Sequence, residues 1–582
     1  MANSAEPDKE TLQKEIVRLR EENERLRSML KLPEDVPAAP IIREQSTLFP
    51  SEEPLPVVDT KSTVEQKVAL FRALFKGRDD VYAVQWVNEH TGKKGYSPAR
   101  FGGYGGKFGD KRTLSLTNEV IYQHLSGDKV LGIYPLLKDD TCFFLACDFD
   151  DEGWELDAKE YIETCRHWKV PACLERSRSG KGGHAWIFFS GAVSAVAARR
   201  LGTGILRETM IVRAEMDLAS YDRFFPNQDF MPKGGYGNLI ALPLQRKARI
   251  LGNTEFLGDD FKPWPDQWAF LSRMQRLSPK HLEALLETMP PVSVGLESAL
   301  VPVKPIRKEP PLPKVIQAEL CAELSLVKSG LTPSLLSQLK HVASMNNPEF
   351  YKKQKLRFST FQTPRFIRCY REDLTHIHLP RGLMENVKKI VEKKGSKLGL
   401  IDRRPKTRHL KLVFKAELKP AQETAVTALL SGEHGVMVSP PGTGKTVVAC
   451  AAIARRNVPT LILLHRKPIL EQWRAQLIST LGLTKKEIGQ LGGGRKRKSG
   501  VVDLAMIQSL RNKADIEELL GTYGLIIIDE CHHIPAVSFE EVLKHAKSRY
   551  ILGLTATPYR RDDLPPKKWT QRRVGSSIAT GS

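Results

Sequence analysis

Residues 435–454 read GVMVSPPGTGKTVVACAAIA, with a short apolar run before the segment SPPGTGKT and a helical pattern after it. This strand–loop–helix context is the one that a phosphate-binding loop requires. Gly442 and Gly444 let backbone amides approach phosphate oxygens closely. Lys445 is expected to reach the β and γ phosphates, and Thr446 to offer its hydroxyl to Mg²⁺ at the start of the helix. The stretch therefore predicts a nucleotide-binding lobe built on a parallel sheet.

A second motif of the same kind follows at residues 523–533, YGLIIIDECHH. Its apolar run predicts a buried strand that delivers Asp529 to the magnesium ion and Glu530 to the attacking water. Short motifs such as these also occur by chance when they stand alone. Both motifs at this separation and in this context indicate a nucleoside-triphosphate hydrolase.

With GLTATP at residues 553–558, these motifs resemble those of superfamily 2 DNA helicases over residues 415–563. LKPAQ, residues 418–422, is similar to the upstream motif in which a glutamine, here Gln422, reads adenine, so the resemblance implies ATP. It also implies two segments that line a nucleic-acid groove and three residues that couple hydrolysis to movement. The segments are 459–473 and 502–510, the coupling residues are Thr555, Ala556 and Thr557, and Thr443 joins the ATP site.

The end of the chain, residues 565–582, has no apolar period. Helicases of this superfamily need a second lobe that completes the ATP site, and too few residues follow Asp563 to form one. We therefore expect the chain to bind ATP but not to unwind DNA alone, unless a separate chain supplies the second lobe. A truncation or a shifted reading frame is expected to produce such a tail.

The stretch DDTCFFLACDFDDEGW, residues 139–154, lies outside the helicase-like region and predicts a buried strand that ends in acidic residues. Because side chains alternate along a strand, Asp148 and Asp150 are expected to point to the same face. Two adjacent carboxylates repel one another unless a cation lies between them, and Mg²⁺ or Mn²⁺ prefers such oxygen ligands. The alternative is a solvated acidic turn at the end of a strand.

A glycine-rich loop follows at residues 179–189, SGKGGHAWIFF, and leads into another apolar strand. Its glycines permit close backbone approach, and Ser179, Lys181 and His184 supply hydrogen-bond donors suited to a triphosphate. A buried structural histidine is the alternative for His184 alone. Together with the two aspartates, the loop predicts two-metal nucleotidyl transfer with NTP or dNTP substrates.

This pair of motifs resembles the archaeo-eukaryotic primase-polymerase superfamily, whose members add a third acidic metal ligand on a later strand. The resemblance implies that the third ligand lies within residues 216–245. We choose Asp222, with Asp229 second and Asp217 third.

The order of the parts along the chain resembles the primase–helicase proteins of TOTE conflict systems, which are proposed anti-invader modules. NPEFYKKQKLRFSTFQTPRFIRCY, residues 347–370, and LPRG, residues 379–382, support this resemblance. The expected fold is multidomain α/β. Its parts are a coiled coil at 8–32, a linker at 33–61, a primase-polymerase-like α+β domain at 62–295, a Pro/Lys-rich linker at 296–314, a connecting domain at 315–410, a RecA-like P-loop lobe at 411–564 and an irregular tail at 565–582.

Residues 9–30 carry apolar side chains at alternating steps of four and three, with Asn23 at one polar position of the seam. This heptad pattern predicts a two-stranded coil and hence a homodimer. The alternative is a single solvated amphipathic helix. The apolar seam residues are Leu12, Ile16, Leu19, Leu26 and Leu30.

The connecting region combines many lysines and arginines with aromatic residues. Such a mixture suits contact with a nucleic-acid backbone and stacking on its bases. In the alternative, the aromatic residues form part of a hydrophobic core and the charged residues lie on a solvent-exposed surface. The aromatic residues are Phe350, Tyr351, Phe358, Phe361, Phe366 and Tyr370.

Lys and Arg number 89 against 67 Asp and Glu, which gives a net charge of +22. An excess of this size indicates a polyanionic partner, here DNA, single-stranded or as a primed template. The 8 cysteines form no CxxC pair, which argues against a zinc ribbon and a disulfide framework. Without a signal peptide or a long apolar run, we expect a cytoplasmic protein, nucleoid-associated in a prokaryote, with no membrane partner.

Three functions fit these features. The first is a primase-polymerase tethered to a DNA-tracking ATPase in a defence system. The second is a repair-type, end-filling polymerase with the ATPase as its targeting module. The third is a catalytically inactive DNA-binding fragment, against which the intact residues Lys445, Asp529, Glu530, Asp148 and Asp150 argue.

Overall fold

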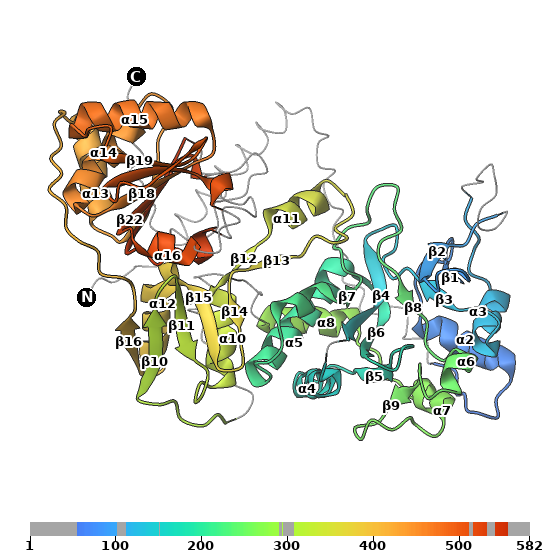
Figure 1. Ribbon diagram of the computed structural model, residues 1–582. Helices are drawn as coiled ribbons and strands as arrows, with labels where there is room; N and C mark the ends of the chain where they lie inside the picture. Colours follow the sequence, from blue (N-terminus) through green and yellow to red (C-terminus); the bar gives the residue numbers. More distant parts are fainter. Residues whose placement is uncertain are drawn as a thin grey trace, which may run out of the picture. The chain divides into compact units, whose positions relative to one another are not determined.

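The computed structural model describes residues 55–101, 112–150, 152–289, 294, 308–510, 516–531 and 542–556 (Figure 1). The heptad segment 9–30 and the tail 565–582 lie outside these residues, so the predicted coil and homodimer stay predictions. None of the described helices is long and apolar enough to cross a membrane. The eight cysteines are all described, and all are free thiols.

Two antiparallel sheets form the region that carries the carboxylate motif, which we call the two-sheet region. Their strand orders are β2-β1-β3-β8 and β7-β4-β6-β5-β9. The strands are β1 (Ala83–Val87), β2 (Lys94–Pro98), β3 (Leu131–Ile133), β4 (Thr141–Phe149), β5 (Cys173–Arg176), β6 (Gly183–Ser194), β7 (Phe224–Phe225), β8 (Ile240–Ala241) and β9 (Phe256–Leu257). The helices are α2 (Val64–Leu74), α3 (Asn118–Ser126), α4 (Trp154–His167), α5 (Ala195–Val212), η1 (Leu218–Asp222), α6 (Arg246–Arg249), α7 (Gln267–Ser272) and α8 (Pro279–Thr288).

Strand β4 is buried on both faces, which explains its nearly continuous apolar sequence. Leu145 and Cys147 pack with α4 and α5, whereas Phe144 and Ala146 pack with α2. Because side chains alternate, Asp148 lies on the same face as Ala146. The predicted buried strand ending in a carboxylate is therefore present.

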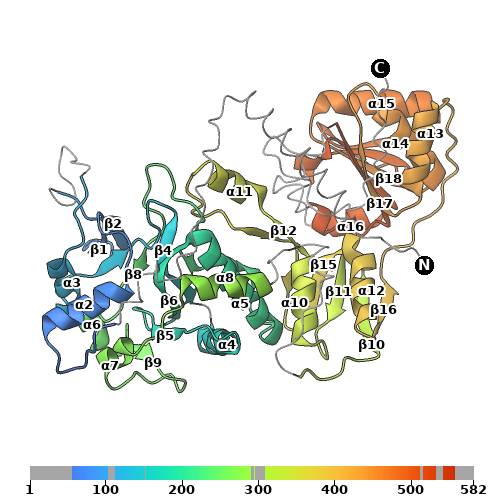
Figure 2. The same ribbon diagram turned by 180° about the vertical axis from the view of Figure 1, so that it is seen from behind.

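The phosphate-binding loop belongs to a seven-stranded sheet of order β17-β23-β22-β18-β21-β19-β20, in which every neighbouring pair is parallel except β19 and β20. Helices α13, α14 and α15 share a core with one face and α16 with the other (Figures 1 and 2). This confirms the mixed α/β class with a parallel sheet. The elements are α13 (Pro420–Leu430), β17 (His434–Val438), α14 (Lys445–Arg456), β18 (Thr460–Leu464), α15 (Lys467–Leu481), β19 (Ile488–Gly492), β20 (Arg495–Arg497), β21 (Val502–Met506), η3 (Ile507–Ser509), α16 (Ile516–Gly521), β22 (Leu525–Ile528) and β23 (Tyr550–Thr555).

Between these regions the chain forms a five-stranded sheet of order β14-β15-β11-β10-β16, with α10 and α12 in its core. Its elements are β10 (Val315–Leu320), β11 (Glu323–Val327), α10 (Pro333–Val342), β14 (Arg371–Glu372), β15 (His376–Pro380), η2 (Arg381–Leu383), α12 (Met384–Lys393) and β16 (Lys397–Asp402). Residues 344–370, between α10 and β14, form a separate excursion that we call the arm. It contains β12 (Ser344–Asn346), α11 (Pro348–Lys355) and β13 (Phe366–Arg368), and β12 pairs with β13.

The arm packs against the two-sheet region. Phe366 belongs to the core that includes residues of α4, α5 and β4, and Phe350 is also buried. Tyr351 and Tyr370 are half-buried, whereas Phe358 and Phe361 are exposed. The core interpretation therefore holds for Phe350 and Phe366, whereas nucleic-acid contact by the exposed aromatic residues stays a prediction.

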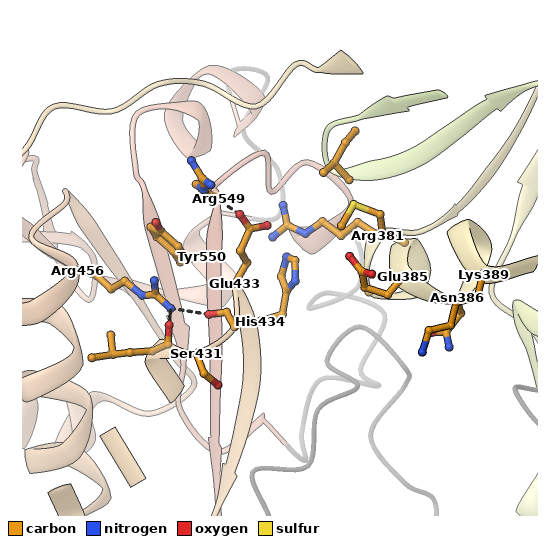
Figure 3. Close-up of a pocket in the computed structure, with 15 residues that line it drawn as sticks. Arg381, Glu385, Asn386, Lys389, Ser431, Glu433, His434, Arg456, Arg549 and Tyr550 are labelled. Carbon is orange, nitrogen blue, oxygen red and sulfur yellow. Dashed lines mark hydrogen bonds and ion pairs between the residues drawn. The ribbon is translucent and has the colours of Figure 1, made fainter. Parts of the chain in front are cut away.

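The LPRG segment anchors the five-stranded sheet to the P-loop lobe. A cavity of about 550 Å³ is lined there by residues of both (Figure 3). Arg381 is 2% exposed and donates to the carbonyl oxygens of Ser548 at 2.7 Å and Ala546 at 3.3 Å. Burial lowers the pKa of Arg381 to about 9. Glu433 in the same lining accepts a hydrogen bond from Arg549 at 2.9 Å.

Candidate active sites

The phosphate-binding loop connects β17 to α14, as predicted. Gly442 and Gly444 have φ angles of 80° and 82°, in the left-handed region that glycine adopts without strain. The Lys445 ammonium donates to the carbonyl oxygen of Ser439 at 2.9 Å, so the loop curls around its own lysine. Thr446 lies in the first turn of α14, where backbone amides favour a bound phosphate.

Asp529 follows β22 directly, at the carboxyl end of this interior strand, in the same sheet as the strand that precedes the loop. Its Oδ2 accepts a hydrogen bond from Trp473 Nε1 at 2.7 Å. Burial raises the pKa of Asp529, against the Trp473 bond and the nearby Lys445, which lower it. Glu530 has a φ of 49°, a conformation that costs energy in a residue with a side chain. Trp473 ends the segment 459–473, which the resemblance assigned to a nucleic-acid groove and not to this site.

Two further predicted segments meet the same loop. Gln422 donates its side-chain amide to the carbonyl oxygen of Thr443 at 3.0 Å. Thr555 is buried at the end of β23, and its carbonyl oxygen accepts from the amide of Ser439 at 3.0 Å. Ala556 follows directly, and Thr557 lies outside the described residues. The structure thus brings three predicted segments, those of Gln422, Asp529 and Thr555, together at the loop.

In the two-sheet region, the aspartates and the glycine-rich loop lie on adjacent strands. Asp148 on β4 is the register partner of His184 on β6, and Asp148 Oδ1 lies 3.6 Å from His184 Nε2. A Cβ added to Gly182 would lie 3.2 Å from Asp150 Cα and 2.5 Å from the carbonyl oxygen of Phe149. The two motifs therefore form one site, and Gly182 leaves no room for a side chain.

The carboxylates of this site are partly exposed, and each has a basic side chain beside it. The side chains of Asp148 and Asp150 are 28% and 62% exposed. Burial raises the pKa of Asp148, and the charge of Asp150 adds to this, whereas His184 and Arg223 oppose it. Arg223, which sequence reasoning missed, contacts Asp150 at 2.8 Å. No group of three or more His, Cys, Asp or Glu side chains could hold a metal ion within the described residues, so the aspartates stand as a pair.

All three candidates for the third acid are bonded to the arm instead. Asp222 Oδ1 accepts from the backbone N–H of Arg365 at 2.9 Å, and burial raises the Asp222 pKa. Asp229 accepts from the amide of Gln354 at 2.6 Å. Asp217 forms an ion pair with Arg368 of the arm at 2.5 Å. The predicted set of Asp148, Asp150 and Asp222 is thus not assembled, because cationic and amide groups distant in sequence bind these acids.

Glu175 on β5 is a further residue of the site that the motifs did not identify. It is 2% exposed, and its Oε2 accepts from His184 Nδ1 at 2.6 Å and from Trp186 Nε1 at 3.2 Å. Burial acts to lower the pKa of His184, but the carboxylates of Glu175 and Asp148 outweigh it and raise the pKa. A glutamate directly after the mostly apolar residues 170–174 was the available signal in the sequence.

The remaining predicted donors lie at the exposed tip of the loop. Ser179 and Lys181 are both exposed, and Ser179 Oγ accepts from the backbone N–H of Lys181 at 3.2 Å. Gly180 between them has a φ of 74°. Arg178 reaches across to Gln85 on β1, with a hydrogen bond of 2.5 Å. The loop thus offers hydroxyl, ammonium and imidazole donors next to the two aspartates.

Several curated proteins are similar to the P-loop part of the chain. The putative DNA 3'-5' helicase Rad25 of Halobacterium salinarum is 37% identical over 171 residues, 28% of this chain and 27% of that protein. The DNA 3'-5' helicase XPB of Mycobacterium tuberculosis is 36% identical over 151 residues, 25% of this chain and 27% of that protein. The chain thus spans about a quarter of the length of these relatives. The solved UvsW helicase from bacteriophage T4 is 15% identical with a TM-score of 0.32, over 42% of this chain and 92% of that chain.

Two families match separate parts of the chain. Residues 66–285 match the family described as TOTE conflict system, Archaeo-Eukaryotic Primase domain, and these residues contain Asp148 and His184. Residues 415–560 match the family described as type III restriction enzyme, res subunit, and these contain Lys445 and Asp529. The chain therefore carries, in this order, a segment that matches an archaeo-eukaryotic primase domain and a segment that matches the res subunit of type III restriction enzymes.

Proposed function

We propose that the chain is a DNA-binding primase-polymerase fused to the ATP-binding domain of a superfamily 2 helicase, and that it acts in a conflict system. One observation carries the proposal: Asp148 pairs in register with His184, which sets two carboxylates beside a glycine-rich loop with three kinds of donor. Carboxylates for a metal and donors for a triphosphate are the two requirements of nucleotidyl transfer.

Asp148 and Asp150 are the groups that would hold Mg²⁺ or Mn²⁺. They fit such an ion because both are partly exposed oxygen ligands and because Asp150 raises the pKa of Asp148, a repulsion that a cation relieves. When bound, the ion supplies Lewis-acid activation of the 3′-hydroxyl and neutralises charge on the triphosphate. His184 and Lys181 donate to the triphosphate of the incoming NTP or dNTP, and Arg223 adds positive charge beside Asp150.

In the helicase domain, Lys445 binds the β and γ phosphates of ATP, and Thr446 and Asp529 would hold Mg²⁺. Glu530 orients the attacking water, and Gln422 contacts the loop that cradles the phosphates. The net charge of +22 supports DNA as the partner along which such an ATPase acts.

Primer extension by the purified chain tests the polymerase. The reaction contains a single-stranded template, NTPs or dNTPs and Mn²⁺, with and without a primer. Product from the unprimed template supports priming, whereas product from the primed template alone favours a repair-type, end-filling polymerase. Asp148→Ala should abolish both products. Asp260→Ala, which removes a carboxylate with a 60% exposed side chain in the turn after β9, is the matched control and should retain them.

ATP binding gives an independent control for a folded protein. Lys445→Ala should abolish ATP binding and leave primer extension unchanged, because the two sites are built by different sheets. If the chain binds ATP but makes no product with any nucleotide, template or metal, nucleotidyl transfer is refuted. If it binds DNA and does neither, it is the inactive DNA-binding fragment.

A further inference from the structure

The arm exposes a short run of large apolar side chains. Leu356, Phe358 and Phe361, in the loop between α11 and β13, are 47%, 56% and 73% exposed. Single exposed apolar residues are ordinary, but a run of this kind marks an interaction surface. Phe350 and Phe366 of the same arm are buried. Phe358 and Phe361 are not among the aromatic residues that the arm buries.

The same segment is strongly basic. Residues 348–365 hold five lysines and arginines against one glutamate, Glu349, which gives a net charge of +4. Lys352 and Lys355 are exposed on α11, directly before the apolar run. Protein-binding surfaces are depleted of lysine at their centres, whereas surfaces for single-stranded nucleic acid interleave aromatic faces with cations.

The exposed loop is held in place by the primase domain. The carbonyl oxygen of Phe358 accepts from the side-chain amide of Gln228 at 3.1 Å, and that of Arg357 accepts from the backbone N–H of Lys233 at 2.8 Å. The guanidinium of Arg357 also pairs with Asp140 at 2.8 Å. A surface fixed in this way loses little conformational entropy when a strand binds to it.

The arm also reaches the flank of the carboxylate site. The backbone N–H of Arg365 is bonded to Asp222, and the next residue, Arg223, contacts Asp150. The carbonyl oxygen of Arg223 in turn accepts from the backbone N–H of Asp148 at 3.0 Å. Two hydrogen bonds and one peptide link therefore join the arm to the strand that carries the aspartates.

We propose that Phe358 and Phe361, with Lys352 and Lys355, form a binding surface for single-stranded nucleic acid that guides the template to the primase site. Bases stack on the two phenylalanine rings while the lysines contact backbone phosphates. The identity of the bound strand as a template rests on the proposed polymerase function, but binding itself needs no catalysis.

Fluorescence anisotropy with a labelled single-stranded oligonucleotide measures the binding. In the full chain, Phe358→Ala with Phe361→Ala should weaken binding roughly 25-fold or more, since each stacked base contributes at least about fivefold. Tryptophan at both positions should retain binding because it keeps the aromatic faces. Leu374→Ala, which removes a 97% exposed side chain between β14 and β15, is the matched control and should change nothing.

The contribution of the lysines is measured separately, through the salt dependence of the binding constant K. Lys352→Ala with Lys355→Ala should reduce the slope of log K against log salt by about 1.4, at about 0.7 per phosphate contact. The phenylalanine variants should leave this slope unchanged. A slope unaffected by removal of both lysines overturns the predicted phosphate contacts.

Photo-crosslinking separates this surface from DNA binding by the helicase domain. An oligonucleotide with 5-iodouracil should crosslink to a peptide that contains Phe358 or Phe361, in the wild-type chain and in the Asp148→Ala chain alike. Crosslinks confined to residues 411–556, or anisotropy unchanged by the double alanine variant, overturn the inference. Reduced self-association in light scattering with unchanged DNA binding identifies a protein-docking surface instead, and also overturns it. Crosslinks at the arm without any primer extension leave the surface established and refute the polymerase.

Discussion

Replacing Glu175 by glutamine tests how a buried carboxylate contributes to nucleotide binding in the primase domain. Both hydrogen bonds of Glu175 end on Oε2, from His184 Nδ1 and Trp186 Nε1. Glutamine has nearly the same shape and keeps one carbonyl oxygen that can accept both bonds. The substitution therefore removes the charge and preserves the packing.

The expected magnitude follows from the nature of the bond. A hydrogen bond to a charged group contributes about 1.5–3 kcal/mol, and one between neutral groups about 0.5–1.5 kcal/mol. The difference of about 1–1.5 kcal/mol corresponds to roughly a 5- to 10-fold change in affinity. Because Glu175 raises the pKa of His184, whose other nitrogen faces the site, the loss should appear in the KM of the nucleotide rather than in kcat.

Steady-state primer extension over a range of nucleotide concentrations measures this effect, with the Tm as a check on folding. Glu208→Gln is the matched control, since Glu208 also accepts from an indole, Trp168 Nε1, at 2.8 Å, but lies on α5. In a His184→Ala protein, Glu175→Gln should have no further effect, because Glu175 is a positioning residue that acts through His184. An equal loss in both backgrounds, or a lower kcat with unchanged KM, would refute this reasoning.

Three further outcomes can be measured directly. Gly182→Ala should lower primer extension by about 100-fold, the scale of a 1 Å misplacement, while ATP binding stays unchanged; normal extension would show that the added Cβ beside Phe149 is tolerated. Arg381→Ala should lower the free energy of unfolding in urea by about 1–3 kcal/mol, because the Ser548 carbonyl oxygen loses its donor; an unchanged midpoint would contradict this. His124 is fully buried and its pKa is lowered from 6.5 to about 4, so the unfolded chain takes up a proton that the folded chain excludes. Stability should therefore fall as the pH drops from about 6.5 to about 4, by up to about 1.4 kcal/mol per pH unit, and His124→Gln should flatten that profile.

The meeting of Lys445, Thr446 and Asp529 could be predicted because it depends on local turns at the ends of strands. Lys445 and Thr446 are fixed by the turn of the chain between one strand and one helix, and Asp529 by the end of another strand. Parallel strands present their carboxyl ends at one edge, so the meeting of these residues follows from the class of sheet. Asp148 and Asp150 were predicted differently, from the alternation of side chains along a strand and from the resemblance to primase-polymerases, and the strands that bring them to the glycine-rich loop are antiparallel.

The surroundings of Asp222 could not be predicted, because they come from a distant part of the sequence. Asp222 and Arg365 are 143 positions apart, and no local pattern records their hydrogen bond. The contact between Glu175 and His184 lies between residues that are only nine positions apart. Glu175 lies on the same face of the sheet as His184, its register partner, but the pairing of β5 with β6 had to be known first.

The arm carries a consequence for how such proteins are assembled from parts in evolution. Phe366 is encoded with the connecting region, yet it completes the core of the primase domain. A gene exchange that cut within the Pro/Lys-rich linker would therefore separate the primase from a piece of its own interior and from the partners of Asp222 and Asp229. The boundary at which the two-sheet region could be inherited with its complete core lies beyond residue 370, past the arm, and not at the linker that the composition marks.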